Sequence, residues 1–196
     1  SPKALRPYTE MGKEALLDAF KDAGIEYREI EHAYCGWVYA DSCAGQKVLY
    51  ETGMTGIPIF NLNNNCSTGS STLFLARQAV ATGLVECALA LGFEQMTPGA
   101  LGIVFPDRPV PMLKFFEKLF EIIPAVEGAP PATMLFAGAG AEHQQKYGTK
   151  KETFAKITVK ARKHGEHNER AIFRNLVTLE EVLASPMQAP PLTRLQ

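Results

Sequence analysis

The run Cys87-Ala88-Leu89-Ala90-Leu91, which ends at Gly92, constrains the fold more than any other part of this 196-residue sequence. It is short, uninterrupted and apolar, and it is bounded by a glycine. A run of this kind is typical of a parallel strand that is buried on both faces. Parallel strands occur with helices between them, so the preceding segments should alternate between strand and helix.

The first part of the chain begins with a helical pattern. Residues 11–23 place apolar side chains at helical spacing, and Gly24 follows as a C-terminal stop. Residues 32–40 are short and partly β-branched and aromatic, which predicts a strand. Asp41 and Ser42 come next and could cap a helix that continues to residue 50.

The same alternation is repeated once more before the run at residues 87–91. Residues 57–62 form a strand candidate in which Pro58 is confined to the start, because proline cannot donate a ladder hydrogen bond. Residues 66–82 are helical, and Gly83 closes them. This alternation predicts an α/β fold of layers, α-β-α, with a mostly parallel sheet.

The pattern changes after residue 96. Residues 97–131 contain many prolines and glycines with scattered aromatic side chains and no steady period, so we interpret them as an insertion over the core. Residues 134–147, 151–164 and 179–184 predict three further helices. The sequence therefore divides into a core at 1–96 and an α-rich second domain at 97–196.

Composition excludes several classes of partner. Lys and Arg number 20 against 21 Asp and Glu, so a net charge of -1 argues against a general affinity for nucleic acid or anionic membrane. No apolar run reaches the roughly 18 residues of a membrane span, and residues 1–7 do not resemble a signal peptide. We expect an intracellular protein without an integral membrane segment.

The four cysteines are not arranged as a disulfide framework or as a C-x-x-C metal motif. Reduced thiols are therefore expected, and Cys35, Cys43 and Cys87 are predicted to pack as small buried apolar residues. Cys66 is different, because it lies between the strand predicted at 57–62 and the first turn of the helix predicted at 66–82. Three asparagines precede it at 63–65, and small residues follow it at 67–70.

This strand-turn-helix elbow is a chemical environment that favours a thiolate. The unpaired N–H groups at a helix N-terminus and the positive end of the macrodipole stabilise an anion. The same N–H groups could stabilise the oxyanion of a tetrahedral intermediate on Cys66, and the small residues after it leave room for an acyl chain. From the residues alone, a structural cysteine at a capped helix start is an equally good interpretation.

A family resemblance favours the nucleophile. The sequence resembles thiolases of the sterol carrier protein 2 (SCP-x) type around their nucleophile and over most of its length. The matching segments are 53–58, 61–69, 76–78, 86–96, 99–107, 137–148 and 154–157. The sequence departs from the family at 109–131 and at 166–171, where an Asn-Pro-rich stretch is expected and Glu-His-Asn-Glu-Arg-Ala stands instead.

The resemblance implies a thiolase-like fold, with Cys66 as the catalytic residue that carries the acyl group. It implies that residues 97–196 form the loop domain that covers coenzyme A. Met134 resembles the methionine that lines the acyl pocket of thiolases, although a core methionine is the alternative. Coenzyme A would be a substrate or product, and no bound cofactor or metal is expected.

The activity implied is that of a 3-ketoacyl-CoA thiolase, which is an acyltransferase of peroxisomal fatty-acid or sterol side-chain oxidation. In the family, a Gly-His-Pro histidine and a second cysteine of the C-terminal half supply the acid and base, and this sequence has no Gly-His-Pro. We therefore expect a fragment that lacks the first strand and is inactive alone. The alternatives are a Claisen-condensing enzyme of the same superfamily and a non-catalytic acyl-CoA-binding, lipid-binding or dimer-partner protein.

Two further expectations concern partners. The family implies a homodimer in which the strand at 57–63 pairs with its copy. A local excess of basic residues could contact the phosphates of coenzyme A, although a solvated helix face is the alternative. These residues are Lys146, Lys150, Lys151, Lys156, Lys160, Arg162, Lys163, Arg170 and Arg174.

Overall fold

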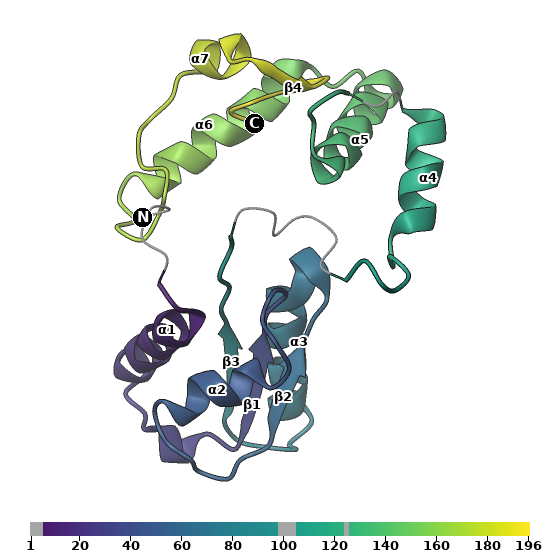
Figure 1. The fold of residues 1–196 in the computed structure, drawn as a ribbon. Coiled ribbons are helices and arrows are strands. Elements are labelled where there is room, and N and C mark those ends of the chain that lie inside the picture. Colours follow the sequence, from purple (N-terminus) through teal and green to yellow (C-terminus); the bar gives the residue numbers. More distant parts are fainter. Residues whose placement is uncertain (1–5, 98–104, 124–125) are drawn as a thin grey trace. The chain divides into compact units, whose positions relative to one another are not determined.

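Three parallel strands organise the first part of the chain in the computed structural model, which describes residues 6–97, 105–123 and 126–196 (Figure 1). The chain forms two units, 1–104 and 105–196. In the first unit the strands are β1 (His32–Gly36), β2 (Ile59–Leu62) and β3 (Ala88–Gly92), in the order β2-β1-β3. The prediction of a parallel sheet is confirmed.

The register brings the carboxyl ends of the three strands to one edge of the sheet. Ala33 lies opposite Ile59 on β2 and Leu89 on β3, and Gly36 lies opposite Leu62 and Gly92. The segments that follow the strands therefore leave the sheet side by side. In open α/β sheets this edge is where ligands bind.

Helices cover both faces of the sheet (Figure 1). Helix α1 (Tyr8–Ala23) and helix α2 (Ala44–Tyr50) lie on one face, where Leu16 and Leu49 are fully buried against Cys35. Helix α3 (Thr68–Ala81) lies on the other face, against Tyr34. Successive strand side chains point to opposite faces, so neighbouring residues of β1 belong to different hydrophobic clusters. The predicted α-β-α layers are present.

The ends of several elements follow the sequence signals. Gly24 ends α1 in the left-handed region with φ 69°, and Gly83 after α3 has φ 71°. The predicted cap of α2 was wrong, because the N-cap residue is Cys43 with φ 62° and not Asp41 or Ser42. A short 3-10 helix at Tyr27–Glu29 connects α1 to the sheet.

The prediction that β3 is buried on both faces was wrong for the described residues. Leu89 and Leu91 are buried among the side chains of α1 and α2, whereas Ala90 and Gly92 on the other face are exposed. Alanine and glycine are small enough to make an apolar run without being covered. The run therefore predicted the strand correctly and its burial only in part.

The second unit is mainly helical (Figure 1). Its helices are α4 (Leu113–Ile122), α5 (Pro131–Tyr147), α6 (Lys151–Gly165) and α7 (Leu179–Ala184), followed by an antiparallel pair, β4 (Met187–Ala189) and β5 (Leu192–Thr193). The three predicted helices are confirmed. The predicted irregular insertion contains α4, which the prolines and glycines on both sides of it obscured in the sequence. None of the described helices is long and apolar enough to cross a membrane.

The boundary predicted between residues 96 and 97 stays a prediction. The two units divide at 104, and residues 98–104 lie outside the described residues.

Candidate active site

Cys66 lies in the connection between β2 and α3. The strand ends at Leu62, a 3-10 turn covers Asn65–Ser67, and α3 begins at Thr68. The Cys66 side chain is exposed at the carboxyl edge of the sheet. Asn65 before it has φ 47°, in the left-handed region that asparagine tolerates better than most residues. The predicted strand-turn-helix elbow is present.

Hydrogen bonds within the elbow hold this turn. The Asn65 N–H donates to Asn63 Oδ1 at 3.2 Å, and the Asn64 N–H donates to Thr68 Oγ1 at 2.8 Å. Thr68 Oγ1 in turn donates to the Asn65 carbonyl at 2.7 Å, and Ser67 Oγ donates to the Asn64 carbonyl at 2.8 Å. The polar side chains around Cys66 are therefore used to fix the backbone that carries it.

The N-terminus of α3 has the properties that an acyl-accepting thiol needs. Its N-cap residue is Ser67, whose side chain makes no capping hydrogen bond to the helix. The N–H groups of the first turn and the macrodipole therefore favour an anion at this end of α3. Residues Gly69 and Ser70 follow, and a Cβ added at Gly69 would meet nothing within 4 Å. The turn is open on this side.

Two polar side chains at the same edge connect β2 and the end of β3 to the segments that follow β1. Asn61 Oδ1 on β2 accepts hydrogen bonds from Trp37 Nε1 at 3.0 Å and from the Gly45 N–H at 2.8 Å. Glu94 after β3 accepts from the backbone N–H groups of Val38 at 2.9 Å and Tyr39 at 3.3 Å. Sequence reasoning missed both roles, and the only signal was a polar residue at or just after a strand end.

Within the first unit, no imidazole lies beside Cys66. His32 is its only histidine. It stands at the start of β1 opposite Ala88, whereas Cys66 follows the far end of the neighbouring strand. A strand rises about 3.3 Å per residue, so the five-residue β1 separates His32 from the carboxyl edge by roughly 13 Å. A general base of the histidine type would have to come from outside this unit.

The other cysteines differ from one another. Cys35 is fully buried, and burial raises the pKa of its thiol to about 12. Cys87 is half-buried and Cys43 is exposed, so the prediction that all three are buried was wrong for Cys43 and correct only in part for Cys87. The reason is its place at the N-cap of α2, where the chain turns at the surface.

These environments predict an order of alkylation by iodoacetamide at neutral pH. Cys66 and Cys43 are both exposed next to a helix N-terminus, but Cys66 precedes the 14-residue α3 whereas Cys43 precedes the 7-residue α2, so the longer helix should favour the Cys66 thiolate more. Cys66 should therefore react first, Cys43 should follow, and Cys35 should stay unlabelled until the chain unfolds. Peptide mapping by mass spectrometry after a brief treatment measures the order. Labelling of Cys43 or Cys87 ahead of Cys66 would contradict the assignment of the nucleophile.

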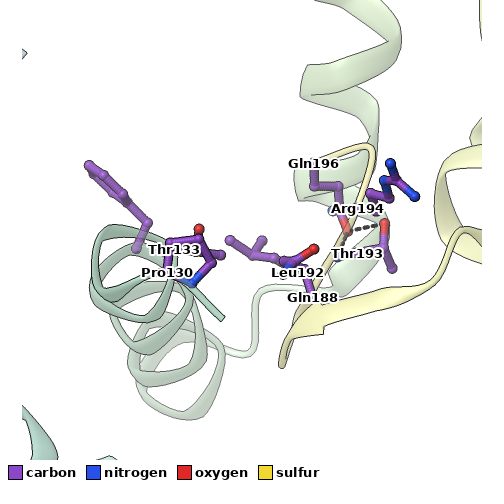
Figure 2. A pocket seen from close by; sticks show the side chains of 8 residues that line it. Pro130, Thr133, Gln188, Leu192, Thr193, Arg194 and Gln196 are labelled. Atoms are coloured by element: carbon purple, nitrogen blue, oxygen red, sulfur yellow. Dashed lines mark hydrogen bonds between the residues drawn. The ribbon is translucent and has the colours of Figure 1, made fainter. Parts of the chain in front are cut away.

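In the second unit, Met134 is buried on α5 and its sulfur lies 3.4 Å from the Val126 N–H. A hollow of ≈ 420 Å³ lies between the start of α5 and the last two strands, lined in part by Thr133, Leu192 and Arg194 (Figure 2). Met134 is not among its lining residues. The role of Met134 at an acyl pocket therefore stays a prediction.

The basic residues of the second unit are mostly exposed. Lys156, Lys160 and Lys163 are exposed along α6, whereas Ala155 on the same helix is buried. This arrangement fits either a solvated helix face or contacts with phosphates. Among the described residues, no group of three His, Cys, Asp or Glu side chains is placed to hold a metal ion.

Comparison with known proteins identifies the family. The family described as "Thiolase, N-terminal domain" matches residues 3–184. The chain is 48% identical to the sterol carrier protein 2 of Oryctolagus cuniculus over 92% of its own length and 33% of that protein. It is 33% identical to the benzoylsuccinyl-CoA thiolase subunit BbsB of Thauera aromatica, over 95% of its own length and 46% of that protein.

A solved structure shows the same fold. An Ltp2-ChsH2(DUF35) aldolase superposes on the whole chain and on 48% of its own chain, with a TM-score of 0.70 and 21% sequence identity. The chain spans about a third of the length of the sterol carrier protein 2 relatives that it matches. The resemblance inferred from the sequence is confirmed, and the chain belongs to the thiolase family, matching its N-terminal domain.

Proposed function

We propose that this chain supplies the acyl-accepting cysteine of a thiolase-type acyltransferase, with Cys66 as the nucleophile. The observation that carries the proposal is the exposed thiol on the β2–α3 elbow, within a segment that matches the thiolase N-terminal domain. The benzoylsuccinyl-CoA thiolase subunit and the acetyl-CoA acetyltransferase of Methanothermobacter thermautotrophicus, which is 30% identical, support an acyl-CoA substrate.

The proposed reaction is cleavage of a 3-ketoacyl-CoA. The Cys66 thiolate attacks the 3-keto carbon, and the resulting alkoxide collapses with rupture of the C2–C3 bond. The bonding electrons leave on C2 as the enolate of a shorter acyl-CoA, which takes a proton from an acid. The acyl group stays on Sγ as a thioester. The thiol of free coenzyme A then loses its proton to a base, attacks this thioester and releases the Cys66 thiolate.

The chain can contribute a nucleophile and oxyanion donors to these steps. The first-turn N–H groups of α3 are the donors that would face an oxyanion formed on Cys66. The acid and base are proposed to lie outside the first unit, because His32 stands at the opposite end of the sheet.

The second unit is proposed to cover coenzyme A, with exposed lysines of α6 near its phosphates and Met134 near the acyl group. A peroxisomal location accompanies this proposal by family resemblance.

Two other functions are separable from this one. A condensing enzyme would carry the same acyl-cysteine but run the carbon–carbon step in the opposite direction. A non-catalytic lipid or acyl-CoA binder is favoured by the names of the sterol carrier protein 2 relatives.

The experiment that tests the proposed acyltransferase is transfer of an acyl group from acetyl-CoA or acetoacetyl-CoA to Cys66, read as a mass increase of the Cys66 peptide. A binder would retain acyl-CoA without this transfer.

We also propose a homodimer that forms through β2. Among the described strands β2 pairs only with β1, so its other edge is unpaired, and exposed edges of this kind invite pairing. The Ala33 N–H donates to the Pro58 carbonyl, and Ala33 lies opposite Ile59. In a parallel ladder this arrangement directs the Ile59 N–H away from β1.

The dimer predicts an effect of proline at this position. Ile59→Pro removes an N–H that does not serve the β1 ladder and should shift the chain to monomer, whereas Ile59→Val should leave association unchanged. Sedimentation velocity of the two variants and the unaltered chain measures the effect. An unaltered chain that is a strict monomer, or a proline variant that associates as before, would contradict pairing through β2.

A further inference from the structure

We propose that Thr68 is a positioning residue for Cys66, because its buried hydroxyl fixes the backbone turn that carries the thiol. The inference rests on the proposed function of Cys66 and goes beyond it by naming the side chain that sets the thiol's orientation. Thr68 itself does not touch the acyl group in this proposal. It acts through the peptide group that precedes Asn64 and the one that follows Asn65.

The hydroxyl of Thr68 makes two hydrogen bonds to consecutive residues of the turn. It accepts from the Asn64 N–H at 2.8 Å and donates to the Asn65 carbonyl at 2.7 Å. These two groups flank the pair Asn64–Asn65, and Asn65 is the residue with φ 47°. Residues other than glycine rarely adopt this conformation, so it persists where surrounding contacts enforce it. One hydroxyl therefore holds the residue directly before Cys66 in an otherwise rare conformation.

The position of Thr68 is set in turn by the sheet. The residue is 5% exposed, and its side chain is β-branched and therefore stiff about χ1. The end of β1 approaches it closely, since a Cβ built on Gly36 would lie 2.8 Å from Thr68 Cγ2. The contacts thus run from the rigid sheet to Thr68, from Thr68 to the turn, and from the turn to Cys66.

Thr72 provides a matched comparison on the same helix. It is 2% exposed, and its hydroxyl donates to the Thr68 carbonyl at 2.7 Å. This bond lies within α3 and does not involve residues 64–66. Replacing either threonine by valine removes a buried hydroxyl of the same kind, but only the change at Thr68 releases the turn.

The test compares alkylation of Cys66 in Thr68→Val, Thr68→Ser and Thr72→Val with the unaltered chain. The rate for Cys66 is divided by the rate for Cys43 in the same sample and followed across neutral and mildly alkaline pH. Loss of two hydrogen bonds should lower this ratio about tenfold in Thr68→Val and change its pH profile. Thr68→Ser keeps the hydroxyl and should restore the ratio to within about twofold of the unaltered chain, as should Thr72→Val.

An unchanged ratio in Thr68→Val, or an equal loss in Thr72→Val, would overturn the proposal. If Thr68→Val does not fold, hydrogen exchange of the Asn64 amide in the unaltered chain decides, because this amide should be protected by Thr68 Oγ1 and exchange at the unprotected rate would contradict it. Alkylation needs no acyl-CoA. A chain with the expected alkylation pattern but without acyl transfer would therefore refute the proposed function alone.

Discussion

Replacing Cys66 by alanine is expected to abolish transfer of an acyl group from acyl-CoA to the protein. A covalent step cannot proceed without its nucleophile, and removing one member of a catalytic set costs about 10⁴-fold to 10⁶-fold in rate. The expected result is a single acylation of the Cys66 peptide in the unaltered chain and none on any peptide of Cys66→Ala. This one transfer needs only the thiolate, whereas repeated turnover would also need the acid and base that are expected outside the first unit. The change should leave the fold intact, because the side chain is exposed.

The matched control for this variant is Cys43→Ala. Cys43 is also exposed and also precedes a helix, but it lies at the start of α2, outside the β2–α3 elbow. Acyl transfer in Cys43→Ala should therefore equal that of the unaltered chain. Acylation that survives in Cys66→Ala and disappears in Cys43→Ala would move the nucleophile to the other helix. Acylation of neither cysteine in the unaltered chain, together with tight retention of acyl-CoA, would favour the binding function.

The sequence predicted the elements of the first unit well because their boundaries rest on local chemistry. Gly24 and Gly83 mark helix ends by adopting a positive φ, which glycine does at no steric cost. The start of α2 and the burial of β3 were predicted less well. Whether Cys43 or Ser42 caps α2 depends on the path of the preceding loop, and whether Ala90 is covered depends on what packs against that face.

The residues of the candidate site also divide into those that local sequence reveals and those whose role depends on a distant contact. Cys66 could be named because a thiol between a strand and a run of small residues is visible in the sequence. The roles of Asn61, Glu94 and Thr68 could not, because each depends on a partner set by the register or by the turn. Asn61 meets Trp37, the residue after β1, only because β2 lies beside β1, and Glu94 meets Val38 only because β3 lies on the other side of β1.

Replacing Gly36 by alanine is expected to destabilise the first unit by about 1–3 kcal/mol, the usual effect of overpacking. A Cβ at this position would lie 2.5 Å from Thr72 Oγ1 and 2.8 Å from Thr68 Cγ2. Both neighbours are β-branched side chains on the buried face of α3, so they cannot turn away freely. Chemical denaturation of the variant and the unaltered chain measures the difference in the free energy of unfolding.

Gly92 is the matched control for Gly36, because it is also a glycine and is also the last residue of its strand. It lies opposite Gly36 on β3, and a Cβ built there meets nothing within 4 Å. Gly92→Ala should therefore leave the free energy of unfolding unchanged within about 0.5 kcal/mol or raise it slightly, since alanine restricts the unfolded chain. Because Thr68 must move to admit a methyl group at Gly36, Gly36→Ala should also slow alkylation of Cys66 relative to Cys43, and Gly92→Ala should not. Equal effects of the two substitutions would mean that the close approach of β1 to α3 does not hold the elbow.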